Sequence, residues 1–290
     1  METEEKIDIC VTIDKNYVEY CGTTMVSILM NSDSFFRFHI VCSGLDNEDK
    51  VKLKKLKEIK KFEINFIEID LDNFKNCYIS DNSHFSPANY FRLKLASLLP
   101  DINKVIYLDS DTIVIKDMVD FWNISFDNSY IIGCKSMVHE RNCKRLGLRE
   151  NAPYINSGVM MMNLKMIRRD NIEKVFFDCI KRNPEIMQNV DQDVINLALL
   201  ETENSIKQIS QKWNTEIRTD TPFTKKYLPI VDDPYIIHYL TGEKPWQKES
   251  KQLYKEEFIK YNKIFNKINK KNFLKKIIIF SKKYVHRKTT

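Results

Sequence analysis

The sequence predicts an α/β fold built around a largely parallel sheet. Short apolar runs rich in β-branched residues alternate with stretches of helical period through the first hundred residues, and such alternation forms βαβ units. Of the 290 residues, 43% are hydrophobic and 30% are charged. The chain therefore buries a sizeable core, is not disordered, and forms one large domain or two small ones.

The first half of the chain begins with two strand–helix units. Ile7–Ile13 is a β-branched run that ends in a turn at Asp14–Tyr17, and a helix is expected over Val18–Met30. Arg37–Ser43 is a second apolar run, and Asp46–Lys60 follows it as an amphipathic helix. Two consecutive units of this kind indicate neighbouring parallel strands.

Two further strands enclose another helix. Phe62–Ile69 and Lys104–Leu108 are the expected strands, and Pro87–Leu99 is the helix, with its proline at the first position, where helices tolerate it. The chain has no Gly-x-Gly-x-x-Gly fingerprint and no P-loop, and it holds only six glycines. A glycine-cradled phosphate is therefore not expected, and a metal would have to hold any phosphate.

The second half is less regular. Its expected helix over Asp191–Leu200 opens with acidic residues, which suit the positive end of the helix dipole. The other elements expected there are strands at Tyr130–Cys134, Ser157–Met162 and Tyr235–Tyr239 and a helix at Lys165–Arg182.

The strand at Lys104–Leu108 ends in two aspartates, Asp109 and Asp111, with Ser110 between them. Residues i and i+2 of a strand point the same way, so both carboxylates can share one cation. Hard oxygen ligands suit Mg²⁺ or Mn²⁺, and in open α/β sheets ligands bind beyond the carboxyl ends of the strands. On spacing alone, the alternative is a solvated turn or a pair of helix caps.

The net charge of +6 is unevenly distributed. Residues 260–290 contain ten lysines, one arginine and no acidic residue, so the rest of the chain is mildly acidic. This pattern argues against a body that binds nucleic acid and for a tail that seeks an anionic surface. A composition shift near Ser250 divides the chain into a catalytic body, 1–249, and a basic tail, 250–290.

The tail has helical periodicity, and two interpretations remain open. Its apolar positions lie among lysines, as in a basic amphipathic helix on a membrane surface. The alternative is a C-terminal helix docked on the body with its lysines in solvent. These positions are Tyr261, Ile264, Phe265 and Ile268, followed by Phe273, Leu274, Ile277 and Ile278.

Three absences predict the location of the protein. There is no run of about 18 apolar residues, as a transmembrane helix requires. Residues 1–6 are polar and acidic, unlike a secretory signal, and the seven cysteines lack paired spacing, as reduced thiols do. We therefore expect a cytoplasmic protein peripherally associated with the inner face of the cell membrane.

Six short segments are weak signals singly but specific as an ordered set. As a set they resemble the family 8 glycosyltransferases, and the likeness covers roughly residues 7–247. The resemblance implies the GT-A fold, a Rossmann-like mixed sheet flanked by helices, and the retaining chemistry of bacterial enzymes that build surface glycans with galactose or glucose. The segments are TIDKNY (Thr12–Tyr17), YFRLKL (Tyr90–Leu95), IYLDSDTIV (Ile106–Val114), YINSGVMMMNL (Tyr154–Leu164), DQD (Asp191–Asp193) and HYLTGEKPW (His238–Trp246).

The resemblance implies a metal–diphosphate site. Asp109, Asp111 and His238 would bind Mn²⁺, with Mg²⁺ as the alternative, and the diphosphate of UDP-glucose or UDP-galactose would complete the shell. Lys244 would neutralise the leaving UDP. Taken alone, His238 is more typical of a core histidine and Lys244 of a surface lysine.

The resemblance also implies where the rest of the donor binds. Thr12, Asp14, Asn16 and Tyr17 correspond to the uridine pocket, although an Asx turn with a cap explains the same residues. Arg92 and Ser110 are further donor-binding residues. Asn156, Asp191 and Gln192 would line the sugar as catalytic residues, with Gln192 or Asp191 at the β-face of its anomeric carbon, unless Asp191 is only a helix N-cap.

The implied reaction transfers a hexose to a hydroxyl group of a glycan, glycolipid or glycoprotein. Glutamine is a poor nucleophile, which favours a front-side route without a covalent intermediate. Relatives often have glycine where this chain has Thr241, and an acidic residue where it has Lys135 and Ser136. The segment Lys135–Asn151 is therefore expected to be a donor or acceptor lid, and the sugar and acceptor stay open.

Two competing hypotheses remain. A haloacid-dehalogenase-type phosphohydrolase also ends a strand in Asp-x-Asp, and Asp232–Asp233 would be its second acidic pair. Such enzymes carry the motif on their first strand, and this hypothesis leaves His238 and Lys244 unexplained. The other alternative is a non-catalytic, membrane-associated carbohydrate-binding protein.

Overall fold

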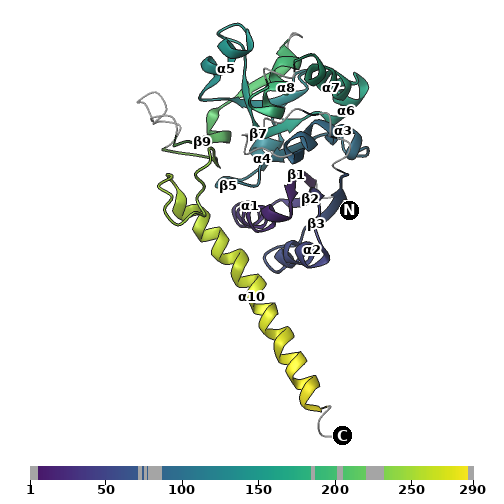
Figure 1. Cartoon of the computed structure of the whole chain (residues 1–290), viewed down its shortest axis with the longest axis vertical. Helices are drawn as coiled ribbons and strands as arrows, with labels where there is room; N and C mark the ends of the chain where they lie inside the picture. Colours follow the sequence, from purple (N-terminus) through teal and green to yellow (C-terminus); the bar gives the residue numbers. More distant parts are fainter. Residues whose placement is uncertain are drawn as a thin grey trace.

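The structure is a computed structural model that describes residues 6–70, 74, 77, 87–183, 187–200, 205–219 and 232–286, without the side chains of 87 and 271–286. A central sheet is flanked by helices on both faces, and a small sheet lies beside it (Figure 1). In the described residues, the strands of the central sheet run in the order β3 (Glu63–Glu68), β2 (Phe35–Ser43), β1 (Lys6–Asp14), β4 (Val105–Leu108), β7 (Ile155–Met162), β6 (Ile131–Lys135) and β8 (Ile206–Ile209). The small sheet has the order β5 (Thr112–Val114), β10 (Ile236–Tyr239) and β9 (Thr215–Ile217).

The central sheet is mixed, and the predicted α/β class is confirmed. β1 pairs in parallel with both β2 and β4, and β2 pairs in parallel with β3. β7 lies antiparallel between β4 and β6. This arrangement puts the carboxyl ends of β1 and β4 next to the start of β7, where the site residues gather.

The predicted helices are present with three local differences, and two short α-helices described below were not predicted. The expected helix at 165–182 is divided into α6 (Leu164–Arg169) and α7 (Ile172–Arg182), because Asn171 takes a left-handed backbone conformation with φ 54°. The segment at 87–99 is mainly the 3₁₀ helix η4 (Pro87–Lys94), followed by α3 (Leu95–Leu98). α2 (Asn47–Lys54) likewise gives way to a 3₁₀ turn, η2 (Lys55–Glu58).

The remaining helical segments of the described residues are distributed from the first strand to the tail. They are η1 (Lys15–Tyr17), α1 (Val18–Asn31), α4 (Val119–Trp122), α5 (His139–Leu146), α8 (Val190–Leu200), η6 (Gln211–Asn214) and α10 (Lys255–His286). α5 lies within the segment expected to be a lid, and η6 precedes β9 in the small sheet.

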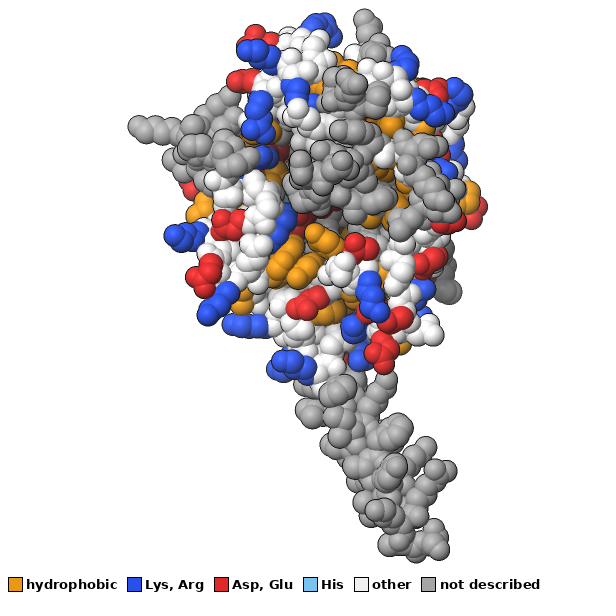
Figure 2. Space-filling view, viewed as in Figure 1, with side chains coloured by type: hydrophobic (Ala, Val, Ile, Leu, Met, Phe, Trp, Pro, Cys, Tyr) orange, Lys and Arg blue, Asp and Glu red, His pale blue; other side chains and the backbone are white. Residues whose placement is uncertain are grey.

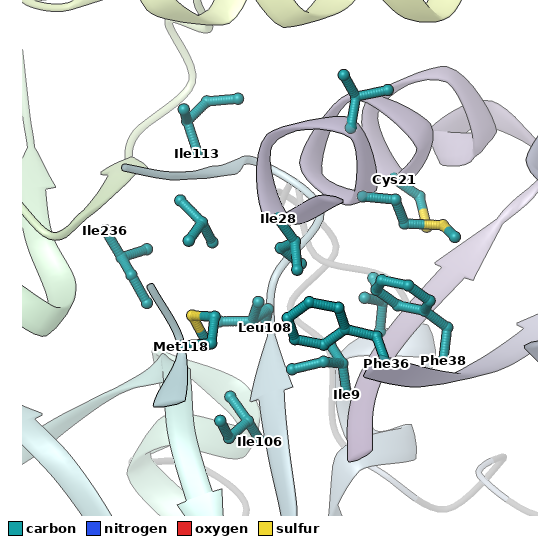
Figure 3. Packing of buried hydrophobic residues seen from close by; sticks show 14 of the residues in the cluster. Ile9, Cys21, Ile28, Phe36, Phe38, Ile106, Leu108, Ile113, Met118 and Ile236 are labelled. Atoms are coloured by element: carbon teal, nitrogen blue, oxygen red, sulfur yellow. The ribbon is translucent and has the colours of Figure 1, made fainter. Parts of the chain in front are cut away.

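Two apolar layers sandwich the central sheet. Ile106 and Leu108 of β4 point into the layer that contains α1, whereas Val105 and Tyr107 point into the opposite layer with η4 and α8. Figure 3 shows Ile106 and Leu108 among the packed side chains of the first layer. Because β4 is buried on both faces, its residues past Leu108 emerge at the sheet edge between the two layers.

The first part of α10 packs against the body. Phe258, Tyr261 and Phe265 are buried, and Phe265 lies against Gly22 of α1, where a Cβ would come within 2.1 Å of its ring. Ile264 and Ile268 are partly buried against the same core. For this part of the tail the docking alternative is correct and the membrane-facing assignment is wrong. The second set of apolar positions, 273–278, lies outside the residues whose side chains are described.

Beyond its docked part, α10 runs away from the body (Figure 1). No helix among the described residues is long and apolar enough to cross a membrane. Figure 2 shows acidic and basic side chains interspersed over the described face of the body. The seven cysteines are all free thiols, as their unpaired spacing predicts, and only Cys77 is not buried.

Candidate active site

The carboxyl ends of β1 and β4 open into a cavity of about 860 Å³. Residues from both strands, from the start of β7, from the first turn of α8 and from the segment after β10 line it. All the predicted site residues line this cavity except Asn16 and Arg92. Segments that are far apart in the sequence thus converge on one space, as expected for the carboxyl edge of an α/β sheet.

Asp109, Asp111 and His238 form a cluster at this edge. Nε2 of His238 lies 3.3 Å from Oδ1 of Asp111 and 3.7 Å from Oδ2 of Asp109. One ligand atom of each residue falls within 4.8 Å of the others. His238 Nε2 and Asp111 Oδ1 are both buried and lack a hydrogen-bond partner. Two such atoms facing each other fit a divalent cation, and two carboxylates with one imidazole suit Mn²⁺.

Lys244 supplies a positive charge beside this cluster. Its Nζ lies 2.7 Å from Oδ2 of Asp111 and 2.7 Å from the carbonyl oxygen of Tyr239. Burial raises the pKa of Asp111, but the neighbouring Lys244 ammonium group opposes it, and the pKa is held below its ordinary value. Asp111 is therefore ionised, as a cation ligand must be.

The turn between His238 and Lys244 explains how a departure from the family is accommodated. Thr241 takes a left-handed backbone conformation, with φ 73°, which favours glycine. Its hydroxyl lies 2.9 Å from that of Thr219. Thr241 therefore takes a backbone conformation that glycine adopts most readily, and Lys244 still reaches Asp111.

Arg92 lies beneath the cavity rather than in its lining. The guanidinium contacts Asp109 at 2.9 Å and Asp191 at 3.1 Å, and donates to the carbonyl oxygen of Ser157 at 2.9 Å. It also stacks over the ring of Tyr107, 4.4 Å from its centroid. The family resemblance implies a donor contact for Arg92, whereas its ionic contacts in the structure are with two carboxylates that face the cavity.

These contacts place Asp191 in an unusual electrostatic setting. Its burial raises its pKa to about 6, although Arg92 acts in the opposite direction. Asp191 also lines the cavity, so it is more than a helix cap. It is a buried carboxylate whose charge depends on Arg92.

The predicted uridine pocket is partly occupied by contacts within the protein. Asp14 accepts a hydrogen bond from the backbone N–H of Asn16 at 2.8 Å, so the capping interpretation is correct for this pair. Thr12 lies 2.8 Å from the hydroxyl of Tyr107, which donates to Asp109. Tyr17 is 37% exposed, so its ring is available to stack on a base.

The opposite end of the cavity joins β7 to α8. Asn156 of β7 donates to Oε1 of Gln192 at 3.0 Å. Gln192 in turn donates to the hydroxyl of Tyr154, which donates to Asp193. Asp193 also pairs with Arg145 of α5 at 2.7 Å. The expected lid segment is thereby attached to the helix that carries Gln192.

Sequence reasoning missed several polar residues of this region. Arg141, Asn189 and Arg218 line the cavity, and Asn214 lies 2.9 Å from the ring nitrogen Nδ1 of His238. No short motif marks any of them. Arg218 directly follows β9 and lies 3.5 Å from Glu216, the residue that is paired with His238, so the alternation of the strand continues to Arg218.

The second acidic pair of the phosphohydrolase hypothesis lies elsewhere. Asp233 pairs with Lys212 at 2.7 Å on the exposed surface, and neither Asp232 nor Asp233 is among the residues that line the cavity. Asp109 accepts from Tyr107 and pairs with Arg92. These contacts hold Asp109 in place and do not favour a nucleophilic role.

The comparisons with known proteins agree with this geometry. The model of glycosyl transferase family 8 matches residues 8–250. The chain is 25% identical over 275 residues to general stress protein A of Bacillus subtilis, covering 90% of this chain and 94% of that protein. It is also 25% identical over 253 residues to a lipopolysaccharide 1,3-galactosyltransferase of Salmonella typhimurium, covering 83% and 73%.

Two solved structures share the fold. A galactosyltransferase, LgtC, in complex with donor and acceptor sugar analogs matches with a TM-score of 0.76 at 22% identity, over 88% of this chain and 95% of that one. The glycosyltransferase GlyE of Streptococcus pneumoniae matches with a TM-score of 0.68 at 19% identity, over 94% of this chain and 64% of that one. These matches confirm the predicted GT-A architecture.

Proposed function

The chain belongs to glycosyl transferase family 8, and on that premise we propose that it transfers glucose or galactose from a UDP-sugar. The acceptor is a hydroxyl group of a glycan, glycolipid or glycoprotein. The configuration at the anomeric carbon is retained. The observation that carries this proposal is the cluster of Asp109, Asp111 and His238, in which unpartnered buried atoms of Asp111 and His238 face each other at the cavity wall. A cavity of about 860 Å³ is large enough for a nucleotide sugar.

Asp109, Asp111 and His238 would hold Mn²⁺, with Mg²⁺ as the alternative. When bound, such an ion neutralises charge on the diphosphate and orients it. The residues themselves are already arranged for this task, since Arg92 and Tyr107 fix Asp109 and Lys244 fixes Asp111. The site therefore needs little rearrangement to accept a cation.

Lys244 is proposed to stabilise the departing UDP. Its ammonium group lies beside Asp111 on a side chain that is only 16% exposed, where a charge acts more strongly than in bulk water. At the other end, Tyr17 would stack on uracil, with Thr12, Asp14 and Ser110 lining the same space. The chain thus offers a base-binding end and a phosphate-binding centre.

The hexose would lie toward Asn156, Asp191 and Gln192. The Gln192 amide is held by hydrogen bonds at both of its polar atoms, and Asp191 is paired with Arg92. Neither group is free to act as a strong nucleophile, so we favour a front-side route. The acceptor oxygen bonds to C1 as the bond from C1 to the phosphate oxygen breaks, and the acceptor's proton passes to that phosphate oxygen.

The remaining part of the tail is proposed to attach the enzyme to an anionic membrane surface at the cytoplasmic side. Residues 260–290 hold eleven cationic side chains and no acidic one. α10 leads away from the body beyond its docked turns (Figure 1). Such a charge excess attracts a negatively charged lipid surface.

The decisive test measures UDP release from UDP-glucose and UDP-galactose with Mn²⁺ and with a chelator. We expect metal-dependent release, and a loss of about 100-fold or more in Asp109→Asn because a cation ligand is removed. Phosphate release from phosphomonoesters without UDP release would overturn the proposal in favour of a phosphohydrolase. Binding of UDP-sugars without any turnover on a panel of sugar acceptors would favour the non-catalytic alternative.

A further inference from the structure

A continuous chain of hydrogen bonds connects the metal-site histidine to Gln192 at the sugar end of the cavity. Nδ1 of His238 lies 2.9 Å from Oδ1 of Asn214, and Nδ2 of Asn214 donates to Oδ1 of Asn156 at 2.9 Å. Nδ2 of Asn156 then donates to Oε1 of Gln192 at 3.0 Å. His238, Asn214 and Asn156 are each at most 5% exposed, so water competes little with these bonds.

The direction of every bond in this chain follows from the backbone of β7. The N–H of Gly158 can only donate, and it does so to Oδ1 of Asn156 at 2.9 Å. The Asn214 atom that faces this oxygen must therefore be its NH₂ group. The oxygen of Asn214 consequently faces His238, so Nδ1 of His238 must carry the proton.

This assignment leaves a lone pair on the other ring nitrogen. Nε2 of His238 is the buried, unpartnered atom that faces Asp111. A metal-bound histidine commonly donates its second ring N–H to an outer group, which fixes the tautomer and the ring orientation. Asn214 occupies that outer place here.

The same backbone segment also fixes the far end of the chain. The N–H of Ser157 donates to Oε1 of Gln192 at 3.3 Å, so the NH₂ group of Gln192 points to the hydroxyl of Tyr154. The amide orientations of Asn156 and Gln192 are thus fixed by the backbone N–H groups of two consecutive residues of β7, Gly158 and Ser157. Asn214 closes the chain between β7 and β10.

Asn214 is itself held rigidly. It ends η6, and its neighbour Trp213 stacks on Phe121 at 5.1 Å and contacts Tyr235 edge-on at 4.9 Å. The next residue, Thr215, pairs with Ile237 across β9 and β10. The side chain of Asn214 is therefore delivered to His238 by a packed element rather than by a free loop.

We propose that Asn214 is a positioning residue that sets the tautomer of the metal ligand His238 and, through Asn156, the orientation of the Gln192 amide. The metal half stands on the geometry of the cluster, whereas the sugar half rests on the proposed glycosyl transfer. The two halves predict different consequences for two substitutions at the same position.

Asn214→Asp retains an oxygen toward His238 but loses the NH₂ group toward Asn156. We expect its Mn²⁺ affinity, measured by electron paramagnetic resonance with UDP present, to stay within about threefold of the unsubstituted chain, because the histidine contact survives. Its kcat for UDP-hexose should fall by at least about tenfold, because two oxygens now face each other and the Asn156–Gln192 end is disturbed.

Asn214→Leu loses both contacts. Its Mn²⁺ affinity should fall by about 10- to 100-fold, the usual effect of removing an outer partner of a metal-bound histidine. Nitrogen-15 NMR of the chain's five histidines, with His238→Gln to assign the signal, should show an Nδ1-protonated ring in the unsubstituted protein and not in Asn214→Leu. The exposed Asn123→Asp, with thermal unfolding of every variant, controls for charge and folding.

Unchanged Mn²⁺ affinity and an unchanged His238 tautomer in folded Asn214→Leu would overturn the metal half. The sugar half is tested in a Gln192→Ala background, where Asn214→Asp should lower kcat by less than about threefold, because the effect passes through Gln192. Full additivity would overturn that half. If the unsubstituted chain releases no UDP from any UDP-hexose, the proposed function and the sugar half fail together, while the NMR tautomer still decides the metal half.

Discussion

The α-carbon of Gly158 lies directly against the imidazole of His238. A Cβ at position 158 would come within 2.2 Å of Cε1 of His238 and 2.6 Å of Oδ2 of Asp109. The two residues belong to different sheets, since Gly158 is in β7 and His238 is in β10. The cluster of Asp109, Asp111 and His238, the candidate metal site, therefore depends on two sheets approaching at a position that admits no side chain.

Gly158→Ala should consequently disrupt the site. The added methyl group must displace His238 or Asp109, both of which are held by neighbouring groups, so we expect Mn²⁺ affinity to fall by about 100-fold or more, as for loss of a ligand. Titration with Mn²⁺ monitored by electron paramagnetic resonance measures this. An affinity within a few-fold of the parent protein would show that the two sheets separate easily.

A second close contact concerns stability rather than metal binding. Phe265 of α10 is 2% exposed and lies against Gly22 of α1. Phe265→Ala should lower the free energy of unfolding by about 3 kcal/mol or more, as expected for a buried phenylalanine. Gly22→Ala should also destabilise the fold, but less so when Phe265 is already alanine, because the clashing ring is gone.

Urea unfolding of the two single variants and the double variant measures this coupling. The Mn²⁺ affinity of the folded protein should be unaffected in all three, which makes them controls for Gly158→Ala. Strict additivity of the two substitutions would contradict the packing of α10 on α1.

Lys244→Gln should slow turnover more than it weakens donor binding. The positive charge beside Asp111 is proposed to stabilise charge that develops on the leaving group, so kcat should fall by about 100-fold. Lys244→Arg should retain part of the activity, because the charge remains. Steady-state kinetics with UDP-hexose measures both, with the exposed Lys248→Gln as the matched control. A change confined to KM would indicate a ground-state binding role instead.

The local sequence pattern was sufficient for seven of the ten described strands and for placing Asp109 and Asp111, but it missed β5, β8 and β9. It was insufficient where distant contacts decide, and His238 was placed with the two aspartates only by the family resemblance. β1, β2 and β4 are continuous apolar runs, and Asp109 and Asp111 follow β4 directly, so their placement follows from short-range chemistry. The burial of Arg92 could not be foreseen, because it depends on Asp191, which is far along the chain.

The position of the tail also depends on a distant contact that its local sequence pattern does not reveal. An apolar stripe among lysines suits a membrane surface and a protein groove equally well. What selects the groove for Phe265 is the missing side chain of Gly22, more than two hundred residues earlier.

The antiparallel direction of β7 is likewise determined by its neighbours β4 and β6, since strand direction leaves no mark on an apolar run.

Asp8 makes stability depend on acid pH. It is 6% exposed and accepts hydrogen bonds from Arg37 at 2.6 and 3.0 Å and contacts His39 at 2.7 Å. Burial raises the pKa of Asp8, but His39 and Arg37 outweigh burial and lower it below the ordinary value of 3.8. The folded state therefore binds this proton less readily than the unfolded chain does, and the stabilisation is complete above pH 3.8 and lost as the pH falls through the folded pKa.

Asp8→Asn should thus cost about 2 kcal/mol at pH 7, because it leaves the partly buried Arg37 and the buried His39 without the carboxylate that they contact. The difference from the parent protein should shrink as the pH falls below 3.8. Urea unfolding across this range measures it, and the exposed Asp120→Asn should change stability by less than about 0.5 kcal/mol. A difference independent of pH would mean that the carboxylate charge is not what stabilises this cluster.

The tail prediction separates docking from membrane attachment. A chain ending at residue 270 keeps the buried contacts of Tyr261 and Phe265 with the body but loses seven of the eleven cationic side chains found between 260 and 290. Each lysine or arginine near an anionic lipid surface contributes about 1 kcal/mol, so this chain should lose most of its affinity for phosphatidylglycerol vesicles while its thermal stability changes little. Co-sedimentation of the full chain should weaken with added salt, because screening shortens the reach of these charges. Equal sedimentation of the two chains, or binding to neutral phosphatidylcholine vesicles that salt does not weaken, would refute electrostatic attachment through residues 271–290.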